Sequence, residues 1–540
     1  MAAYNNRLTQ SNDAYIDEYV RSFLEGEATP GIEYEYEMIQ RILPAIDTEA
    51  VNAKLAQLLI SDNNIVTVTG PEKEGYSLPS ENDLRNVFAL VQTKAIEPYV
   101  EKEVADNLMG NKPLKGKVIS EKHDKILGVT TWELSNGMKV LLKPTEFKKD
   151  EILMGSIGYG GRSWTEDNES LEAAFIQFVP IWGGIGDFSS SDLKKVLAGK
   201  NANLNVSIGN WTQGTSGSSS VKDIETLLQL NYLYFTKPRA DYDVFSNFQK
   251  MLIDRFTNLE QDPAFGFQQQ VTYSKYGNNP RMQNITTSDI KSLNYEKIIE
   301  LYTMLFASPG SFTFSFTGNI DLKVLKPLVE TYLASLPSGN KDAMYNKVNI
   351  GTRTGKYEVT YEEQMMNPKS KVFINYSGNT DYNLKNQIAM SVLNQILDIV
   401  YVRTIREDEG GTYGVGVSAY VNRIPKNESA ITMTFDTNPE QVKRLTGLIH
   451  KGIEAIAENG PEKDDFSKVR AYMLKQFDED IRTNSYWLST ISSLGFYDDD
   501  SYSAFKKTLE ELSINDIKSI ASELINQNNL IEVIQNPINQ

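Results

Sequence analysis

The sequence contains no cysteine and only two histidines among its 540 residues. The absence of cysteine excludes disulfides, thiol nucleophiles and thiolate metal sites. The histidines, His123 and His450, stand alone, because neither has a Glu-x-x-His partner or another histidine at ligand spacing. We therefore interpret both as ordinary surface residues and expect no metal site formed by this chain alone.

Basic residues are outnumbered, with 54 Lys and Arg against 71 Asp and Glu and a formal net charge of −17. Because nucleic-acid binding depends on clustered Lys and Arg, we expect no nucleic-acid partner. No apolar run is long enough for a membrane span, and the best stretch, 389–402, is interrupted by Asn394, Gln395 and Asp398 as in a core helix. The first residues lack the apolar core of a secretory signal, so the compartment is not readable from them.

One pattern of helix, turn and strand occurs three times along the chain. Each copy begins with Asp, Asn or Ser, turns at Asn or Gly, and closes with a short β-rich segment. The copies end near residues 71, 320 and 537, so their ends lie 249 and 217 residues apart. We interpret them as the closing elements of three related domains. The helices are expected over 45–60, 292–306 and 512–525, and the strands over 65–69, 312–316 and 530–534.

This spacing predicts the domain organisation. We expect the end of a domain over 1–75, a linker with a charged helix (80–109) over 76–125, and two α+β domains over 126–336 and 337–540. The first α+β domain opens with two strands joined at an Asn-Gly turn, Asn136-Gly137. Hairpin strands mixed with long helices predict an α+β fold of repeated layered domains, each a mostly antiparallel sheet covered by helices.

Only about 70 residues precede the first closing strand, whereas the other domains use roughly 200 each. The chain is therefore expected to begin inside a domain.

The segment with the clearest chemical potential joins a long helix over 384–406 to a strand over 415–421. Arg406 ends the helix, and Tyr413 follows it by seven residues across a glycine turn. A guanidinium and a phenol at one corner can together hold a peptide carbonyl or a developing oxyanion. The alternative from spacing alone is a helix C-cap, with the arginine favouring the dipole and the tyrosine packing on the helix end.

The element from Arg406 to Tyr413, with Gly411 and Gly414 around it, resembles the Arg-Tyr element in the C-terminal half of the pitrilysin/insulinase family of zinc metallopeptidases. Other stretches that resemble the family, in the same order, are 26–33 (bacterial members), 134–140, 192–200 and 235–241. The resemblance implies four homologous α+β domains in two halves that close on a peptide like a clam shell. This chain would hold the end of the second domain, the linker, and the third and fourth domains.

The resemblance supplies no metal ligand. The family binds zinc in its first domain through a His-x-x-Glu-His element with a further Glu, whereas the corresponding part of the third domain, 173–178, reads Ala-Ala-Phe-Ile-Gln-Phe. It therefore implies zinc in the full-length enzyme, bound outside this chain, and an inactive chain on its own. The Arg-Tyr element, by contrast, transfers residue by residue. Tyr413 would donate a hydrogen bond to the oxyanion or scissile carbonyl, and Arg406 would fix the substrate backbone or orient the tyrosine.

The function implied is the C-terminal half of a zinc metalloendopeptidase that hydrolyses peptides in an enclosed chamber. Its partners would be the peptide substrate and the missing N-terminal half that carries the metal. The alternative is a non-catalytic scaffold or partner subunit of a peptidase-like complex. Analogy to bacterial members implies the periplasm or cell envelope as the location.

Overall fold

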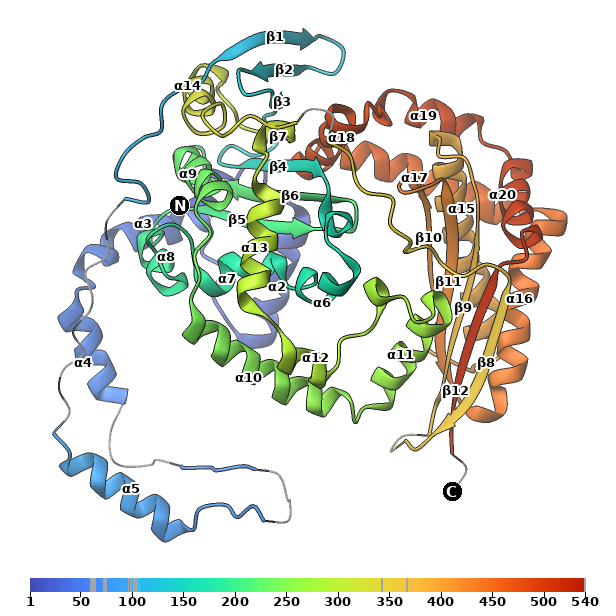
Figure 1. Ribbon diagram of the computed structural model, residues 1–540, viewed down its shortest axis with the longest axis horizontal. Coiled ribbons are helices and arrows are strands. Elements are labelled where there is room, and N and C mark those ends of the chain that lie inside the picture. The colour runs from blue at the N-terminus through green and yellow to red at the C-terminus, as the bar shows by residue number, and fades with distance from the viewer. Residues whose placement is uncertain are drawn as a thin grey trace. The chain divides into compact units, whose positions relative to one another are not determined.

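The computed structural model describes residues 1–58, 65–70, 75–95, 97, 100, 105, 107–340, 343–365 and 368–538. The chain divides into two compact units, Met1–Ala105 and Asp106–Gln540. In the larger unit, two sheets that are mostly antiparallel are covered by helices (Figure 1). This confirms the predicted α+β fold class.

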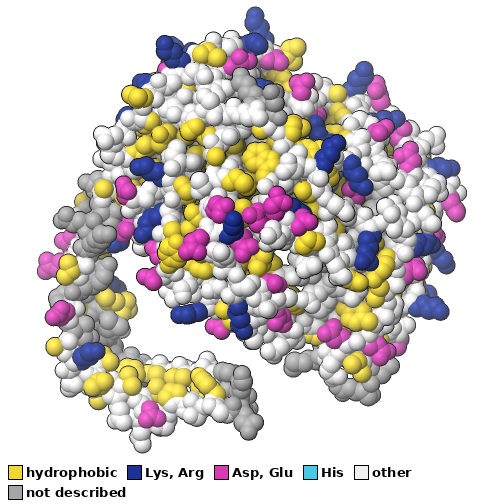
Figure 2. Space-filling view, in the orientation of Figure 1, with side chains coloured by type: hydrophobic (Ala, Val, Ile, Leu, Met, Phe, Trp, Pro, Cys, Tyr) yellow, Lys and Arg dark blue, Asp and Glu magenta, His cyan; other side chains and the backbone are white. Residues whose placement is uncertain are grey.

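The smaller unit is helical in the part that is described. Its elements are α1 Ala2–Asn5, α2 Asn12–Glu25, α3 Ile32–Ile42, the 3-10 turn η1 Leu43–Ala45, α4 Thr48–Leu58 and α5 Glu81–Thr93. The helices α2, α3 and α4 bury no residue, and Figure 2 shows hydrophobic side chains on the surface of this unit. The helix predicted over 80–109 ends at Thr93, where the chain becomes extended.

The strand predicted over 65–69 is not formed, and Ile65 is 92% exposed. A strand needs a neighbour for its backbone hydrogen bonds, and the described residues of Met1–Ala105 contain no strand to pair with it. The turn predicted at 62–64 and the end of the helix before it lie outside the described residues.

The first sheet has the strand order β1-β2-β3-β7-β4-β6-β5. The strands are β1 Val118–Asp124, β2 Val129–Leu134, β3 Lys139–Pro144, β4 Ile152–Tyr159, β5 Ala202–Ile208, β6 Thr212–Ser219 and β7 Thr313–Gly318. Only the β3 and β7 pair is parallel among these strands. The predicted hairpin joins β2 to β3, with Gly137 at φ 98°, a left-handed conformation that favours glycine.

The second sheet has the order β10-β11-β9-β12-β8. The strands are β8 Lys356–Glu363, β9 Ser370–Gly378, β10 Gly416–Asn422, β11 Glu428–Thr437 and β12 Leu530–Pro537. Here β8 and β12 form the parallel pair. The order β3-β7-β4-β6-β5 in the first sheet matches β8-β12-β9-β11-β10 in the second, and both place the strands as first, last, second, fourth and third. The domain boundaries at residues 75, 125 and 336 stay predictions.

The helices of the larger unit include the two later copies of the repeated pattern, α13 before β7 and α20 before β12. The helices are α6 Ser170–Ala173, α7 Val179–Gly183, α8 Ser190–Val196, α9 Ile224–Thr236, α10 Tyr242–Leu259, α11 Pro263–Tyr276, α12 Thr287–Ser292, α13 Tyr295–Phe306, α14 Leu322–Tyr332, α15 Leu384–Tyr401, α16 Val442–Asn459, α17 Lys463–Asp480, α18 Asn484–Tyr497, α19 Tyr502–Glu511 and α20 Ile514–Asn526. Short 3-10 turns are η2 Gly161–Trp164, η3 Asp167–Glu169, η4 Ile176–Phe178, η5 Pro280–Met282, η6 Pro309–Ser311 and η8 Pro439–Gln441.

The run Leu384–Glu407, which contains α15, is long and apolar enough to cross a membrane by length and composition alone. Half of its most apolar stretch is nevertheless buried inside the protein. Helix α15 contacts β10, α17 and α20, and its buried side chains belong to the core beneath the second sheet. In the structure it is a core helix, as its interrupting polar residues predicted.

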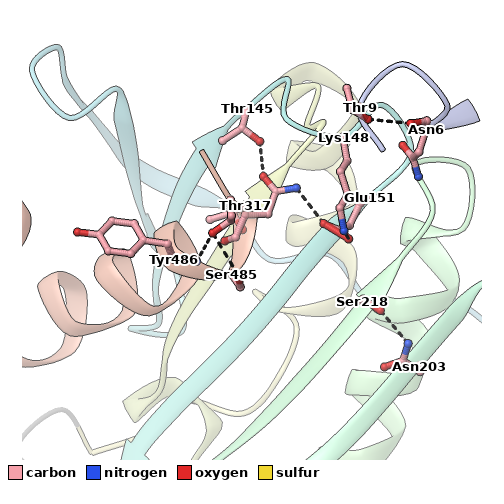
Figure 3. Close-up of polar contacts among 12 residues, drawn as sticks. Asn6, Thr9, Thr145, Lys148, Glu151, Asn203, Ser218, Thr317, Ser485 and Tyr486 are labelled. Atoms are coloured by element: carbon pink, nitrogen blue, oxygen red, sulfur yellow. Dashed lines mark hydrogen bonds and ion pairs between the residues drawn. The ribbon is translucent and has the colours of Figure 1, made fainter. Parts of the chain in front are cut away.

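Helix α18 comes from the C-terminal part of the chain but packs on β3, β4 and β7 of the first sheet. The buried Asn484 accepts a hydrogen bond from Thr145 and donates one to Glu151 at 3.0 Å, and its backbone carbonyl accepts from Thr317 at 2.9 Å. Figure 3 shows these three partners gathered at the start of α18. At Gly495 a Cβ atom would lie 2.3 Å from a leucine of β3, so the glycine permits this close packing.

Candidate functional site

The helix that leads to the predicted corner ends in a π-helix, η7 Val402–Glu407. There the backbone N–H of Asp408 donates to the carbonyl of Arg403 at 3.0 Å, five residues back. Single π turns inside α-helices are rare and are found frequently at functional sites. Arg406 lies on this turn. The chain then reverses at Gly410, whose φ of +60° is left-handed.

The loop after the π-helix is held at Gly411. A Cβ atom there would lie 2.6 Å from the side chain of Leu445, in α16, and 3.2 Å from that of Gln441, the residue before α16. The carbonyl of Gly411 accepts a hydrogen bond from the buried Thr437 hydroxyl, at the end of β11, at 2.7 Å. The loop that carries Tyr413 is therefore fixed against α16 and β11 at its middle.

The two predicted site residues lie on the surface of this loop. Tyr413 is 90% exposed, and Arg406 is also exposed. Within the described part of the chain, the guanidinium of Arg406 has no hydrogen bond or ion pair, and no ring contact joins it to Tyr413. The alternative in which Tyr413 packs on the helix end is wrong, because the ring is almost fully open to solvent. Both polar groups are instead available to a ligand.

A groove of about 710 Å³ lies next to Tyr413. Lys369 lines the groove, and its Nζ lies 5.8 Å from the centre of the Tyr413 ring. The lining residues come from the end of α10, the start of α11 and the turn between them, from the β8–β9 connection and the start of β9, and from β11: Asn258, Gln261, Asp262, Pro263, Ala264, Gln364, Met365, Lys369, Lys371 and Asp436.

Two of the four charged side chains that line the groove form an ion pair, and a third accepts a backbone hydrogen bond. Lys371 pairs with Asp436 at 3.3 Å, and a carboxylate oxygen of Asp262 accepts from the backbone N–H of Ala264 at 2.8 Å. The amide side chains on the lining can both donate and accept, so they suit the backbone of an extended polypeptide. The groove is not recognisable from the sequence, because its walls come from three segments far apart in the chain and no motif marks any of them.

The histidines do not form a metal site. Both ring nitrogens of His450 have protein partners, with Nδ1 at 2.6 Å from the Tyr376 hydroxyl and Nε2 at 2.7 Å from a Glu532 carboxylate oxygen. Burial raises the pKa of Tyr376. His450 is thus part of a half-buried network, and its interpretation as an ordinary surface residue is wrong. His123 is exposed and contacts Thr130 at 3.0 Å.

Across the residues that the structure describes, no group of three or more His, Asp or Glu side chains could hold a metal ion. The described part of this chain therefore does not fit a zinc site.

Residues 292–473 match the family model described as the Peptidase M16 inactive domain. The chain is 24% identical over 504 residues to a zinc protease PQQL-like of Arabidopsis thaliana, covering 91% of this chain and 50% of that protein. It is 23% identical over 412 residues to the probable zinc protease PqqL of Escherichia coli strain K12, covering 75% of this chain and 44% of that protein.

Among solved structures, the periplasmic protease PqqL from Escherichia coli aligns with a TM-score of 0.72 at 19% identity, covering 99% of this chain and 59% of that chain. At this identity the likeness shows the fold alone. The chain spans about half the length of the curated relatives it matches.

Proposed function

Because this chain is a homologue of the PqqL-like zinc proteases of the pitrilysin/insulinase family, we propose that it is the C-terminal half of a zinc metalloendopeptidase that hydrolyses peptides in an enclosed chamber. Zinc would be held outside this chain and would supply an activated water and a Lewis acid. The part of the chain described here would contribute substrate binding and oxyanion stabilisation.

The observation that carries this role is the exposed phenol of Tyr413 at the edge of the groove. A hydroxyl that is not already hydrogen-bonded within the protein can donate a hydrogen bond to the negative charge that develops on a carbonyl oxygen. Arg406, seven residues away and without a partner in the described structure, would donate to a peptide carbonyl and fix the substrate backbone. The groove lined by Lys369 would receive the adjoining length of peptide.

The smaller unit supports a missing N-terminal half. Helices α2 and α3 have clear apolar faces, yet neither buries a residue, and Phe23 and Leu24 are 87% and 72% exposed. Exposed apolar faces of this kind are typical of surfaces that another part of a protein covers. We assign that cover to the half that carries the metal.

The test is Tyr413→Phe in the full-length protein, assayed on a quenched peptide. We expect kcat to fall ~10²–10³-fold, because a donor aimed at developing charge acts mainly in the transition state. KM should change much less. Arg406→Ala should also lower activity, with a larger share of the loss in KM. The melting temperature should stay constant for Tyr413→Phe, since the side chain is exposed.

Tyr472→Phe is the matched control, because Tyr472 is also exposed, at 57%, and does not line the groove. Full turnover by Tyr413→Phe would remove the catalytic role. A full-length protein that holds no zinc and cleaves no peptide would instead be a scaffold.

Metal analysis tests the division of labour between the halves. The chain purified alone should contain no stoichiometric zinc after dialysis and should cleave no peptide. One tightly held zinc per chain that is lost on His450→Ala would contradict this. We also propose a periplasmic or cell-envelope location, which fractionation of the tagged full-length protein would check.

A further inference from the structure

A small polar cavity lies beside η2 in the first α+β part of the larger unit, with a volume of about 10 Å³. Two arginines, Arg162 and Arg281, line it. The other lining residues are Ser163, Ser170, Asn210, one threonine and three residues with apolar side chains. No carboxylate is among the described residues that line it. The cavity is therefore locally cationic in a chain whose net charge is −17.

Arg162 is the unbalanced charge in this cavity. Its Nε atom is buried and has no hydrogen-bond partner among the described residues. Nor does its guanidinium form an ion pair with any of them. Burial lowers the pKa of Arg162, which is the expected response of a cation taken from water without a counter-charge. Arg162 as a whole is partly exposed, so water screens part of its charge, but its buried Nε–H has no acceptor and would be satisfied by one from outside the described chain.

Arg281 differs because every one of its nitrogens is engaged. Its Nε pairs with Asp167, while Nη1 and Nη2 donate to the carbonyls of Arg162 and Thr165. Arg281 thus holds the η2 turn in place. Its own charge is balanced by a carboxylate that is 70% exposed.

The hydroxyl protons at the cavity are also in use. Ser163 donates to the carbonyl of Gly160 at 2.6 Å, and Ser170 donates to that of Pro280 at 2.9 Å. The side-chain amide of Asn210 has no hydrogen bond within the described structure. The groups left with protons to donate are therefore the Arg162 guanidinium, the Asn210 amide and the second N–H on each Nη atom of Arg281.

We propose that this cavity binds one small anionic group, either a chloride ion or one oxygen of a carboxylate. Arg162 and Asn210 would hold it. The volume corresponds to about one solvent-sized sphere, so a chloride ion enters only with a small movement of the lining, and a tetrahedral oxyanion such as phosphate is too large to enter. A water molecule would satisfy the Nε–H of Arg162 but would leave its charge unbalanced. An anion satisfies both requirements. The site does not depend on peptidase activity.

The bound anion would also steady the segment between the two sheets. Val348 and Ile350 of this segment line the cavity, and the backbone N–H of Asn346 donates to the Ser163 hydroxyl at 3.0 Å. We therefore expect anion binding to raise thermal stability.

The first experiment soaks crystals of the 540-residue chain in sodium bromide and locates the halide by anomalous scattering. An anomalous peak in the cavity within hydrogen-bonding distance of Arg162 Nε is expected. An empty cavity under these conditions overturns the halide as the ligand, without relying on any variant, and leaves the carboxylate oxygen to the melting comparison in formate.

The second experiment compares melting temperatures in sodium chloride, sodium formate and sodium methanesulfonate at one ionic strength, the last being a tetrahedral oxyanion too large to enter. A saturable rise of ~1–3 °C at ten times Kd is expected in chloride or formate over methanesulfonate, and the salt that gives it identifies a halide or a carboxylate as the ligand. Arg162→Gln should abolish the rise, whereas Arg255→Gln, at an exposed arginine of α10, should keep it. Equal melting temperatures in all three salts, or a rise retained by Arg162→Gln, would overturn the proposal. If Arg162→Gln does not fold, Asn210→Ala takes its place and should weaken the rise.

Discussion

We expect the packing of α18 on the first sheet to be sensitive to one substitution, Asn484→Ala. Asn484 begins α18 and is 3% exposed. Replacing it with alanine removes the side-chain amide while leaving a residue that a helix accepts readily. The hydrogen bond from Thr317 to the backbone carbonyl is kept, so the substitution isolates the side chain.

The magnitude follows from the two hydrogen bonds that are lost. The bond from Thr145 is between neutral groups and contributes ~1 kcal/mol, while the bond to the carboxylate of Glu151 contributes ~1.5–3 kcal/mol. The Glu151 carboxylate keeps its ion pair with Lys148 at 2.7 Å, so it is not left alone. We expect Asn484→Ala to lower the free energy of unfolding by ~2–4 kcal/mol.

Urea denaturation followed by tryptophan fluorescence measures this loss, since Trp487 lies on the same helix and is buried. Ser485→Ala is the matched control, because Ser485 is exposed and its hydroxyl contacts only Thr483, at 3.4 Å. The control should change stability by less than ~0.5 kcal/mol. If Asn484→Ala lowers the free energy of unfolding no more than the control does, the view that this network holds α18 on the first sheet is refuted.

Two further predictions concern stability. His450→Ala leaves the buried Tyr376 hydroxyl without its partner, so the free energy of unfolding should fall by ~1–3 kcal/mol in urea melts, whereas His123→Ala on exposed β1 should change it by less than ~0.5 kcal/mol. Equal effects of the two histidine substitutions would count against the network. The pKa of Asp241 is lowered, first by its hydrogen bond with Arg239, so its charge stabilises the fold above the unfolded pKa near 3.8 and that stability disappears as the pH falls through the lower folded pKa. Asp241→Asn should therefore be less stable than wild type at pH 7 and equally stable in acid, and a pH-independent difference in thermal melts would contradict this.

Local sequence signals predicted the elements well where one segment decides its own structure. The Asn136-Gly137 turn forms its hairpin, and the strands expected at 312–316 and 530–534 appear as β7 and β12. The strand expected at 65–69 did not form, because a strand depends on a neighbour that its own sequence cannot supply. The helix expected to run to Arg406 does so, but only the structure shows that its last turns are π-helical.

The candidate site was predictable only in part, for the same reason. Arg406 and Tyr413 lie in one continuous motif and could be named from the sequence. The groove beside them is built from the α10–α11 turn, the β8–β9 connection and β11, and only tertiary packing brings these together. The network at His450 was missed in the same way, because Tyr376 and Glu532 come from strands on either side of it in the chain.

The parallel pairing of an earlier strand of each sheet with its last strand, β3 with β7 and β8 with β12, has a consequence for synthesis on the ribosome. In the second sheet, β12 lies between β8 and β9 and hydrogen-bonds to both, yet it is the last of the five strands to be translated. Until it emerges, β8 has no partner among the described strands of its sheet, and the apolar side chains of α15 remain without their full cover. The sheet cannot form strand by strand during translation, because β12 is made after β8 and β9, the two strands that flank it. A nascent chain halted before residue 530 would therefore expose the two strand edges that β12 later covers, one on β8 and one on β9, and unpaired edges of this kind are prone to aggregate without a chaperone.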